Sequence, residues 1–201
     1  MRDRAMVGVE HKHKGIFVCD MSDLFGIGVP EAWTTEVLDC IAQNNAYPKD
    51  RFYLLTKQPQ NLIKFSPFPD NCWVGVSVTD TLMLIDACKY LRSIDATVKY
   101  LSLEPLLDWD TFGVDTLLRR LLYDAHIRQV IIGSQTKPYR PPEISDIKEI
   151  VEACDKAGIP VFLKNNLYGL WYNKTNDGSN QIPQWATRKN YHDILRQEMP
   201  E

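Results

Sequence analysis

Glu104 and Lys164 are the two charged residues in this sequence with the widest range of possible catalytic roles. Each directly follows an apolar run. Glu104 could accept hydrogen bonds from a ligand amine or ribose, or act as a general base. Lys164, if desolvated, could react as a neutral amine and form a Schiff base with a carbonyl substrate. The non-catalytic alternative is a buried ion pair between the two that fixes loop positions. If the protein is an enzyme, we predict Glu104 and Lys164 as its catalytic residues.

Other polar residues end the remaining apolar runs. Ser102 precedes Glu104 by two positions, so alternation along a strand places both side chains on one face, and Pro105 ends the strand there. The candidates for binding a cofactor or ligand are Ser22, Asp23, Thr56, Ser77, Ser102 and Gln135. In parallel β/α folds the carboxyl ends of the strands form the mouth where ligands bind, so we expect these side chains to converge.

Six apolar runs, each followed by a segment of different periodicity, must position these side chains. The predicted strands are 16–19, 52–55, 73–79, 99–106, 129–132 and 160–163. Six β/α units in series predict an α/β fold with a parallel sheet and right-handed crossovers. Either an open doubly wound sheet or a curled barrel would satisfy that pattern.

The third predicted strand discriminates between the two architectures. Its valines face one way, and Gly75, Ser77 and Thr79 face the other. A sheet covered by helices on both sides would more often be apolar on both faces. The alternation therefore favours a TIM-like (β/α) barrel of six parallel strands with alternating helices and a polar lumen.

Composition excludes several classes of protein. The 201 residues are 44% hydrophobic with a net charge of -3, which provides no basic field for nucleic acid. No apolar run approaches the roughly 20 residues of a membrane span, so we predict a cytoplasmic protein without a membrane partner. Five cysteines form no CxxC pair, which predicts reduced thiols and no metal site. We predict a flexible lead-in over 1–14, one barrel domain over 15–185 and a C-terminal tail over 186–201.

Five segments in fixed order resemble a known family. They are 20–25 (DMSDLF), 55–59 (LTKQP), 73–78 (WVGVSV), 101–106 (LSLEPL) and 162–165 (FLKN). Together they resemble the phage-type three-cysteine-motif family, a domain of unknown function related to radical-SAM proteins. The match spans about residues 15–185, and Gln135 stands where the family often has glutamate.

The resemblance implies a partial (β/α) TIM-like barrel that is open where a first β/α unit is missing. Family members carry, ahead of the segment that matches Ile16, another strand and a loop of three closely spaced cysteines that is taken to hold a [4Fe-4S] cluster. This chain has neither, so the resemblance implies a first β/α unit that is either truncated at the gene level or replaced by another chain. By the resemblance, S-adenosylmethionine is the expected cofactor, and a [4Fe-4S] cluster is expected only if the missing N-terminal segment is supplied. The chain is then expected to be inactive alone.

Two other functions stay open at this point. One is a cluster-independent TIM-like enzyme that uses Lys164 and Glu104, and the other is a non-enzymatic binding protein or remnant phage protein. An open barrel also exposes the edge of its first strand, which predicts a homodimer or a complementing N-terminal chain at that edge. A small molecule or nucleotide is the expected occupant of the mouth, whereas substrate and reaction are not indicated.

Overall fold

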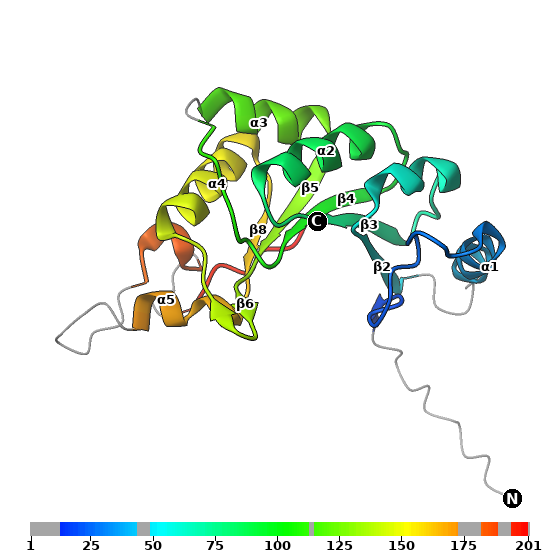
Figure 1. The fold of residues 1–201 in the computed structure, drawn as a ribbon, viewed down its shortest axis with the longest axis horizontal. Helices are drawn as coiled ribbons and strands as arrows, with labels where there is room; N and C mark the ends of the chain where they lie inside the picture. The colour runs from blue at the N-terminus through cyan, green and yellow to red at the C-terminus, as the bar shows by residue number, and fades with distance from the viewer. Residues whose placement is uncertain (1–12, 44–48, 113–114, 173–181, 189–193, 201) are drawn as a thin grey trace, which may run out of the picture.

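The computed structural model describes residues 13–43, 49–112, 115–172, 182–188 and 194–200. Most of the predicted lead-in, residues 1–12, lies outside the described residues. The described chain alternates strands with helices, as six β/α units require (Figure 1). None of the described helices is long and apolar enough to cross a membrane.

The main sheet has six strands, each parallel to its neighbours. They are β1 (Gly15–Phe17), β2 (Arg51–Thr56), β3 (Cys72–Ser77), β4 (Val98–Leu103), β5 (Ile127–Ile132) and β8 (Val161–Leu163). Their order in the sheet follows their order in the sequence. A small antiparallel hairpin follows β5 and consists of β6 (Gln135–Thr136) and β7 (Tyr139–Arg140).

The connections between strands are helical. The α-helices are α1 (Glu31–Ala42), α2 (Thr81–Arg92), α3 (Asp115–Asp124), α4 (Ile144–Ala157) and α5 (Gly169–Tyr172), and the 3-10 turns are η1 (Pro59–Phe65), η2 (Asn165–Leu167) and η3 (Gln184–Ala186). Asp80 is the N-cap of helix α2, because its carboxylate accepts a hydrogen bond from the Met83 amide at 2.8 Å. Gly158 ends α4 in a left-handed conformation, with φ 69°.

The sheet curls into a half-barrel, and α2, α3 and α4 lie along one side of it in Figure 1. A sheet whose order follows the sequence, with same-handed crossovers, carries its crossover helices on one face. One continuous hydrophobic cluster joins α1, α2, α3 and α4 to that face. The predicted α/β fold with a curled sheet of six parallel strands is therefore confirmed, and the open doubly wound alternative is wrong.

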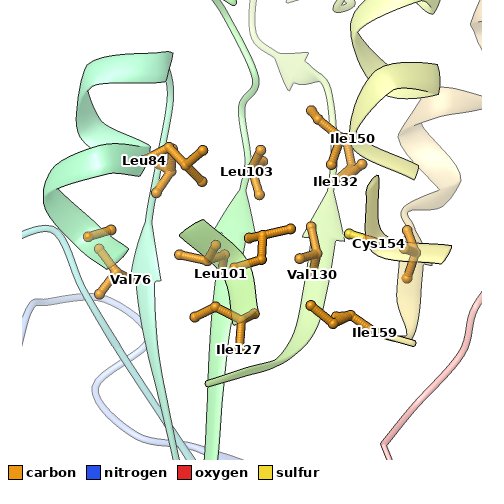
Figure 2. Packing of buried hydrophobic residues seen from close by; sticks show 14 of the residues in the cluster. Val76, Leu84, Leu101, Leu103, Ile127, Val130, Ile132, Ile150, Cys154 and Ile159 are labelled. Atoms are coloured by element: carbon orange, nitrogen blue, oxygen red, sulfur yellow. The ribbon is translucent and has the colours of Figure 1, made fainter. Parts of the chain in front are cut away.

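The alternation in β3 builds this core. Val74, Val76 and Val78 all belong to the hydrophobic cluster shared with the helices. Figure 2 shows the packing between the sheet and the helices at Val76, Leu84, Leu101, Leu103, Ile127, Val130, Ile132, Ile150, Cys154 and Ile159. The opposite, concave face differs from the prediction, because its amino-terminal half is not polar. Trp73, Val98 and Tyr100 form a second buried cluster there.

The two edges of the sheet differ in their hydrogen-bond pairing. At the β8 edge the Leu163 amide donates to the Arg196 carbonyl at 2.8 Å, and the Glu198 amide donates to the Val161 carbonyl at 3.0 Å. At the other edge β1 pairs only with β2 among the described residues. The predicted dimer or complementing chain at β1 stays a prediction.

Candidate functional site

Glu104 and Lys164 meet at the carboxyl ends of the strands, although 60 residues separate them. The Lys164 ammonium donates to Glu104 Oε2 at 2.6 Å, and the two side chains remain 41% and 27% exposed. The contact expected between them is thus present, but the pair is accessible to solvent and not buried. An ion pair that solvent and a ligand can reach contributes little to stability and stays available for recognition.

A glycine on the strand between them makes this contact possible. Glu104 follows β4 and Lys164 follows β8, so β5 lies between the two residues. A Cβ atom at Gly133, just beyond β5, would lie 3.0 Å from the Cγ and Oε1 atoms of Glu104. The Glu104 side chain thus rests against the bare backbone of Gly133 while it reaches Lys164. Side chains larger than hydrogen at this position would force Glu104 to move.

Asn166, which was not among the predicted site residues, completes this part of the site. Its Nδ2 donates to the Ser134 carbonyl at 2.9 Å, and its Oδ1 accepts from the Ser134 amide at 3.1 Å. The same Nδ2 lies 3.4 Å from Glu104 Oε1. Asn166 therefore ties the end of β5 to the turn after β8 and helps to orient the carboxylate. Its place two residues after Lys164 in a polar run is the only sequence signal for it.

Two predicted serines lie side by side beneath the ion pair. Ser77 and Ser102 are register partners on β3 and β4, and each residue is only 5% exposed. Neither hydroxyl forms a hydrogen bond with another described residue. These hydroxyls are therefore candidate ligand contacts on the concave face, two positions before Glu104.

Asp23 and Thr56 pair with each other instead of joining Glu104. The Asp23 carboxylate accepts hydrogen bonds from Thr56 Oγ1 at 2.9 Å, the Lys57 amide at 2.8 Å and the Phe25 amide at 3.0 Å. These contacts fasten the loop after β1 to the end of β2, and Thr56 is fully buried. The geometry gives both residues a role in holding the mouth together. Ser22 lies in the same loop and is exposed.

Gln135 lies on the hairpin that follows β5. It pairs with Arg140 through the β6–β7 ladder and is partly exposed. In Figure 1 this hairpin stands beside α5, below the sheet. The Tyr139 hydroxyl lies against Gly169, where an added Cβ would come within 2.8 Å of it. The hairpin is thus held against the segment that follows Lys164, which places Gln135 near the rim of the mouth.

Aromatic side chains close the concave face on its amino-terminal side. Tyr100 covers Gly75 on the neighbouring strand, where a Cβ would lie only 2.3–2.5 Å from the ring. The Tyr100 hydroxyl donates to the Leu54 carbonyl at 3.1 Å, and burial raises the pKa of this phenol. Tyr53 and Trp73 pack edge to face with ring centroids 5.2 Å apart. We call Tyr53, Trp73, Val98 and Tyr100 the aromatic floor.

Comparison with known proteins identifies the family of this chain. A family model described as a protein of unknown function, DUF5131, matches residues 5–200. The chain belongs to the DUF5131 family. No curated protein matches the chain, and no solved structure matches it. The match confirms the part of the expected resemblance that concerned a domain of unknown function, and its description names no activity.

Two open grooves of this DUF5131 chain lie away from the ion pair, at the amino-terminal ends of the strands. One, of about 710 Å³, lies beside Arg128, Gly158 and Arg196. The other, of about 600 Å³, lies beside Lys14, Arg51 and Trp73. Neither lining includes Glu104 or Lys164. In parallel β/α folds the amino-terminal ends of strands serve stability and the carboxyl ends carry chemistry, so we place the candidate site at the mouth.

The cysteines of the DUF5131 chain do not fit a [4Fe-4S] cluster. Burial raises the pKa of Cys72 and of Cys88 to about 12, and it also raises the pKa of Cys154. A cluster needs closely spaced thiolates, whereas these three thiols are buried in the core. The described residues contain no group of three or more His, Cys, Asp or Glu side chains that could hold a metal ion.

Proposed function

We propose that this chain is the ligand-binding half-barrel of a phage-type, radical-SAM-like protein with a TIM-like barrel, and that its mouth binds S-adenosylmethionine. The observation that supports the proposal is the solvent-accessible pair of Glu104 and Lys164. Around it stand Asn166 and the hydroxyls of Ser77 and Ser102, which have no partner among the described residues. The site therefore offers a carboxylate, an ammonium, an amide and two hydroxyls within one concave region.

These groups match the chemistry of an amino-acid nucleoside. The Lys164 ammonium would bind the ligand carboxylate, and Glu104 would accept hydrogen bonds from the ligand ammonium or a ribose hydroxyl. Ser77 and Ser102 would supply neutral hydrogen bonds deeper on the concave face. The ligand carboxylate would take the place of Glu104 beside Lys164, and the ligand ammonium would take the place of Lys164 beside Glu104. Each protein charge would therefore keep a partner of opposite sign on binding.

Under this proposal the chain binds S-adenosylmethionine but does not carry out radical chemistry alone. S-adenosylmethionine supplies radicals only when a reduced iron-sulfur cluster cleaves it. Cys72, Cys88 and Cys154 are buried, and the other two thiols, Cys19 and Cys40, cannot supply a three-cysteine loop. Three closely spaced cysteines would have to come from another segment or another polypeptide.

Calorimetric titration with S-adenosylmethionine tests the proposal. We expect Glu104→Gln and Lys164→Met each to raise the Kd by about tenfold or more, because each removes one charge-assisted hydrogen bond. Lys148→Met is the matched control, since Lys148 pairs with Glu152 at 3.6 Å on α4, away from the mouth. Wild-type protein that does not bind the compound, or four proteins with equal affinity, would refute the proposal.

The accessibility of Lys164 favours a second candidate, a cluster-independent enzyme that forms a Schiff base. The amine is 41% exposed and has a carboxylate at 2.6 Å that could accept its proton. Borohydride reduction in the presence of a panel of aldehydes and ketones should then trap an adduct on Lys164, located by peptide mass spectrometry. The absence of any adduct on Lys164 would remove this candidate.

A further inference from the structure

The C-terminal segment reaches the candidate site through one side chain. Residues 195–198, which we call the C-terminal strap, run antiparallel along the free edge of β8, where Gln197 is the bridge partner of Phe162. Gln197 Nε2 donates to the Leu163 carbonyl at 3.3 Å and to Asn165 Oδ1 at 2.8 Å. Leu163 and Asn165 are the two neighbours of Lys164 in the chain. The Gln197 side-chain amide therefore contacts both chain neighbours of Lys164, the residue that carries the positive charge of the site.

The turn held in this way is short and contains the site residues. Lys164 precedes η2, and its carbonyl accepts from the Leu167 amide at 3.0 Å. Asn166, which orients Glu104, lies inside η2. A shift of this turn relative to β5 would move both Lys164 and Asn166 with respect to Glu104. The Lys164 amide also donates to the Ile132 carbonyl at 2.9 Å, so both β5 and the C-terminal strap hold this turn.

The strap does not depend on Gln197 for its own attachment. The Arg196 guanidinium donates to Asp155 on α4 at 2.6 Å and to Glu198 at 2.7 Å. Burial lowers the pKa of Arg196, but the hydrogen bonds to both carboxylates outweigh this and raise it overall. Leu195 is fully buried, and Gln129 Nε2 donates to the Glu198 carbonyl at 3.1 Å. Removing the Gln197 amide should therefore leave the strap in place.

We propose that Gln197 is a positioning residue of the candidate site, and that through it the C-terminal strap sets the geometry of the pair formed by Lys164 and Glu104. The role in ligand binding rests on the proposed function, but the role in holding Lys164 does not. Gln197 contacts no reacting group itself. It acts through the Leu163 carbonyl and the Asn165 side chain, on either side of Lys164.

Residue-resolved acylation of lysine amines tests this proposal without any ligand. An ammonium held by a carboxylate must leave its partner before it can be acylated, so loosening the turn should speed the reaction. We expect Gln197→Ala to raise the acylation rate of Lys164, relative to Lys148 in the same molecule, by about two- to tenfold, the range for loss of one neutral hydrogen bond. Gln60→Ala is the control, because Gln60 also donates through Nε2, to Gln58 at 2.7 Å, but far from Lys164.

The two proposals fail in distinguishable ways. If the ratio of Lys164 to Lys148 acylation is the same in Gln197→Ala as in wild type, Gln197 does not position Lys164, whatever the melting temperature does. If the ratio rises but wild-type protein does not bind S-adenosylmethionine, the proposed ligand is wrong and the positioning role stands. If both hold, Gln197→Ala should also raise the Kd for S-adenosylmethionine, and Gln60→Ala should not.

Discussion

The two halves of the concave face use polar and apolar groups in opposite ways. In the amino-terminal half Trp73, Val98 and Tyr100 are buried, and the Tyr100 hydroxyl donates to the Leu54 carbonyl. In the carboxyl-terminal half Ser77 and Ser102 have no hydrogen-bond partner among the described residues, and an ion pair stays open to solvent. The floor is mainly apolar packing, whereas the mouth combines a solvent-accessible ion pair with two hydroxyls that form no hydrogen bond to the described residues. That contrast is typical of a binding site on a packed support.

The largest effect expected from this contrast is at Gly75 in the floor. An alanine Cβ there would lie 2.3–2.5 Å from the buried Tyr100 ring, which has no space to retreat. We expect Gly75→Ala to lower the free energy of unfolding by about 2–3 kcal/mol. Urea denaturation followed by circular dichroism measures this. An unchanged midpoint would show that the floor is loosely packed.

A smaller effect is expected at Gly133, the corresponding glycine in the mouth. An added Cβ would lie 3.0 Å from Glu104, but this side chain is partly exposed and can move. We expect Gly133→Ala to cost about 1 kcal/mol of stability and to weaken the pair of Glu104 and Lys164. Faster acylation of Lys164 would report the second effect. Equal destabilisation by Gly75→Ala and Gly133→Ala would remove the distinction between floor and mouth.

Breaking the ion pair itself should matter still less for stability. Both partners are partly exposed, and solvent screens their attraction, so Lys164→Met should change the free energy of unfolding by about 0–1 kcal/mol. The same substitution is expected to weaken ligand binding by about tenfold or more. Urea denaturation and calorimetry on one preparation give both numbers. A loss of several kcal/mol in stability would mean that the pair is structural.

The smallest effect is expected at Ser102, whose hydroxyl has no partner among the described residues. Ser102→Ala should leave the free energy of unfolding within about 0.5 kcal/mol of wild type. Thr34→Val is the matched control, because Thr34 Oγ1 is buried and donates to the Leu24 carbonyl at 2.9 Å. That variant should lose about 1 kcal/mol. A larger loss at Ser102 than at Thr34 would show that the Ser102 hydroxyl is already satisfied.

The periodicity of apolar residues predicted the features of the fold that depend on local sequence pattern. Alternation placed Val74 and Val76 in the core and Ser102 and Glu104 on the other face, and the order of β/α units predicted the parallel sheet. The contact between Glu104 and Lys164 followed because the carboxyl ends of parallel strands converge. The catalytic role of either residue stays a prediction.

The remaining features depend on contacts between distant segments, which no local pattern encodes. Asp23 was grouped with the mouth because of its type, yet three donors from two loops engage its carboxylate. Asn166 and Gln197 look like ordinary polar residues in sequence, and only the pairing of the strap with β8 places Gln197 beside Lys164. The aromatic floor was missed because Tyr100 lies over Gly75 on the neighbouring strand, and sequence alone does not give that register.

Photoaffinity labelling with an azido analogue of S-adenosylmethionine locates the ligand on the chain and so tests whether the mouth is its binding site. We expect crosslinks, competed by S-adenosylmethionine, in peptides from the strand ends that contain Ser102, Gln135 or Lys164. Competed crosslinks confined to the groove beside Lys14 and Arg51, at the opposite end of the strands, would contradict this expectation.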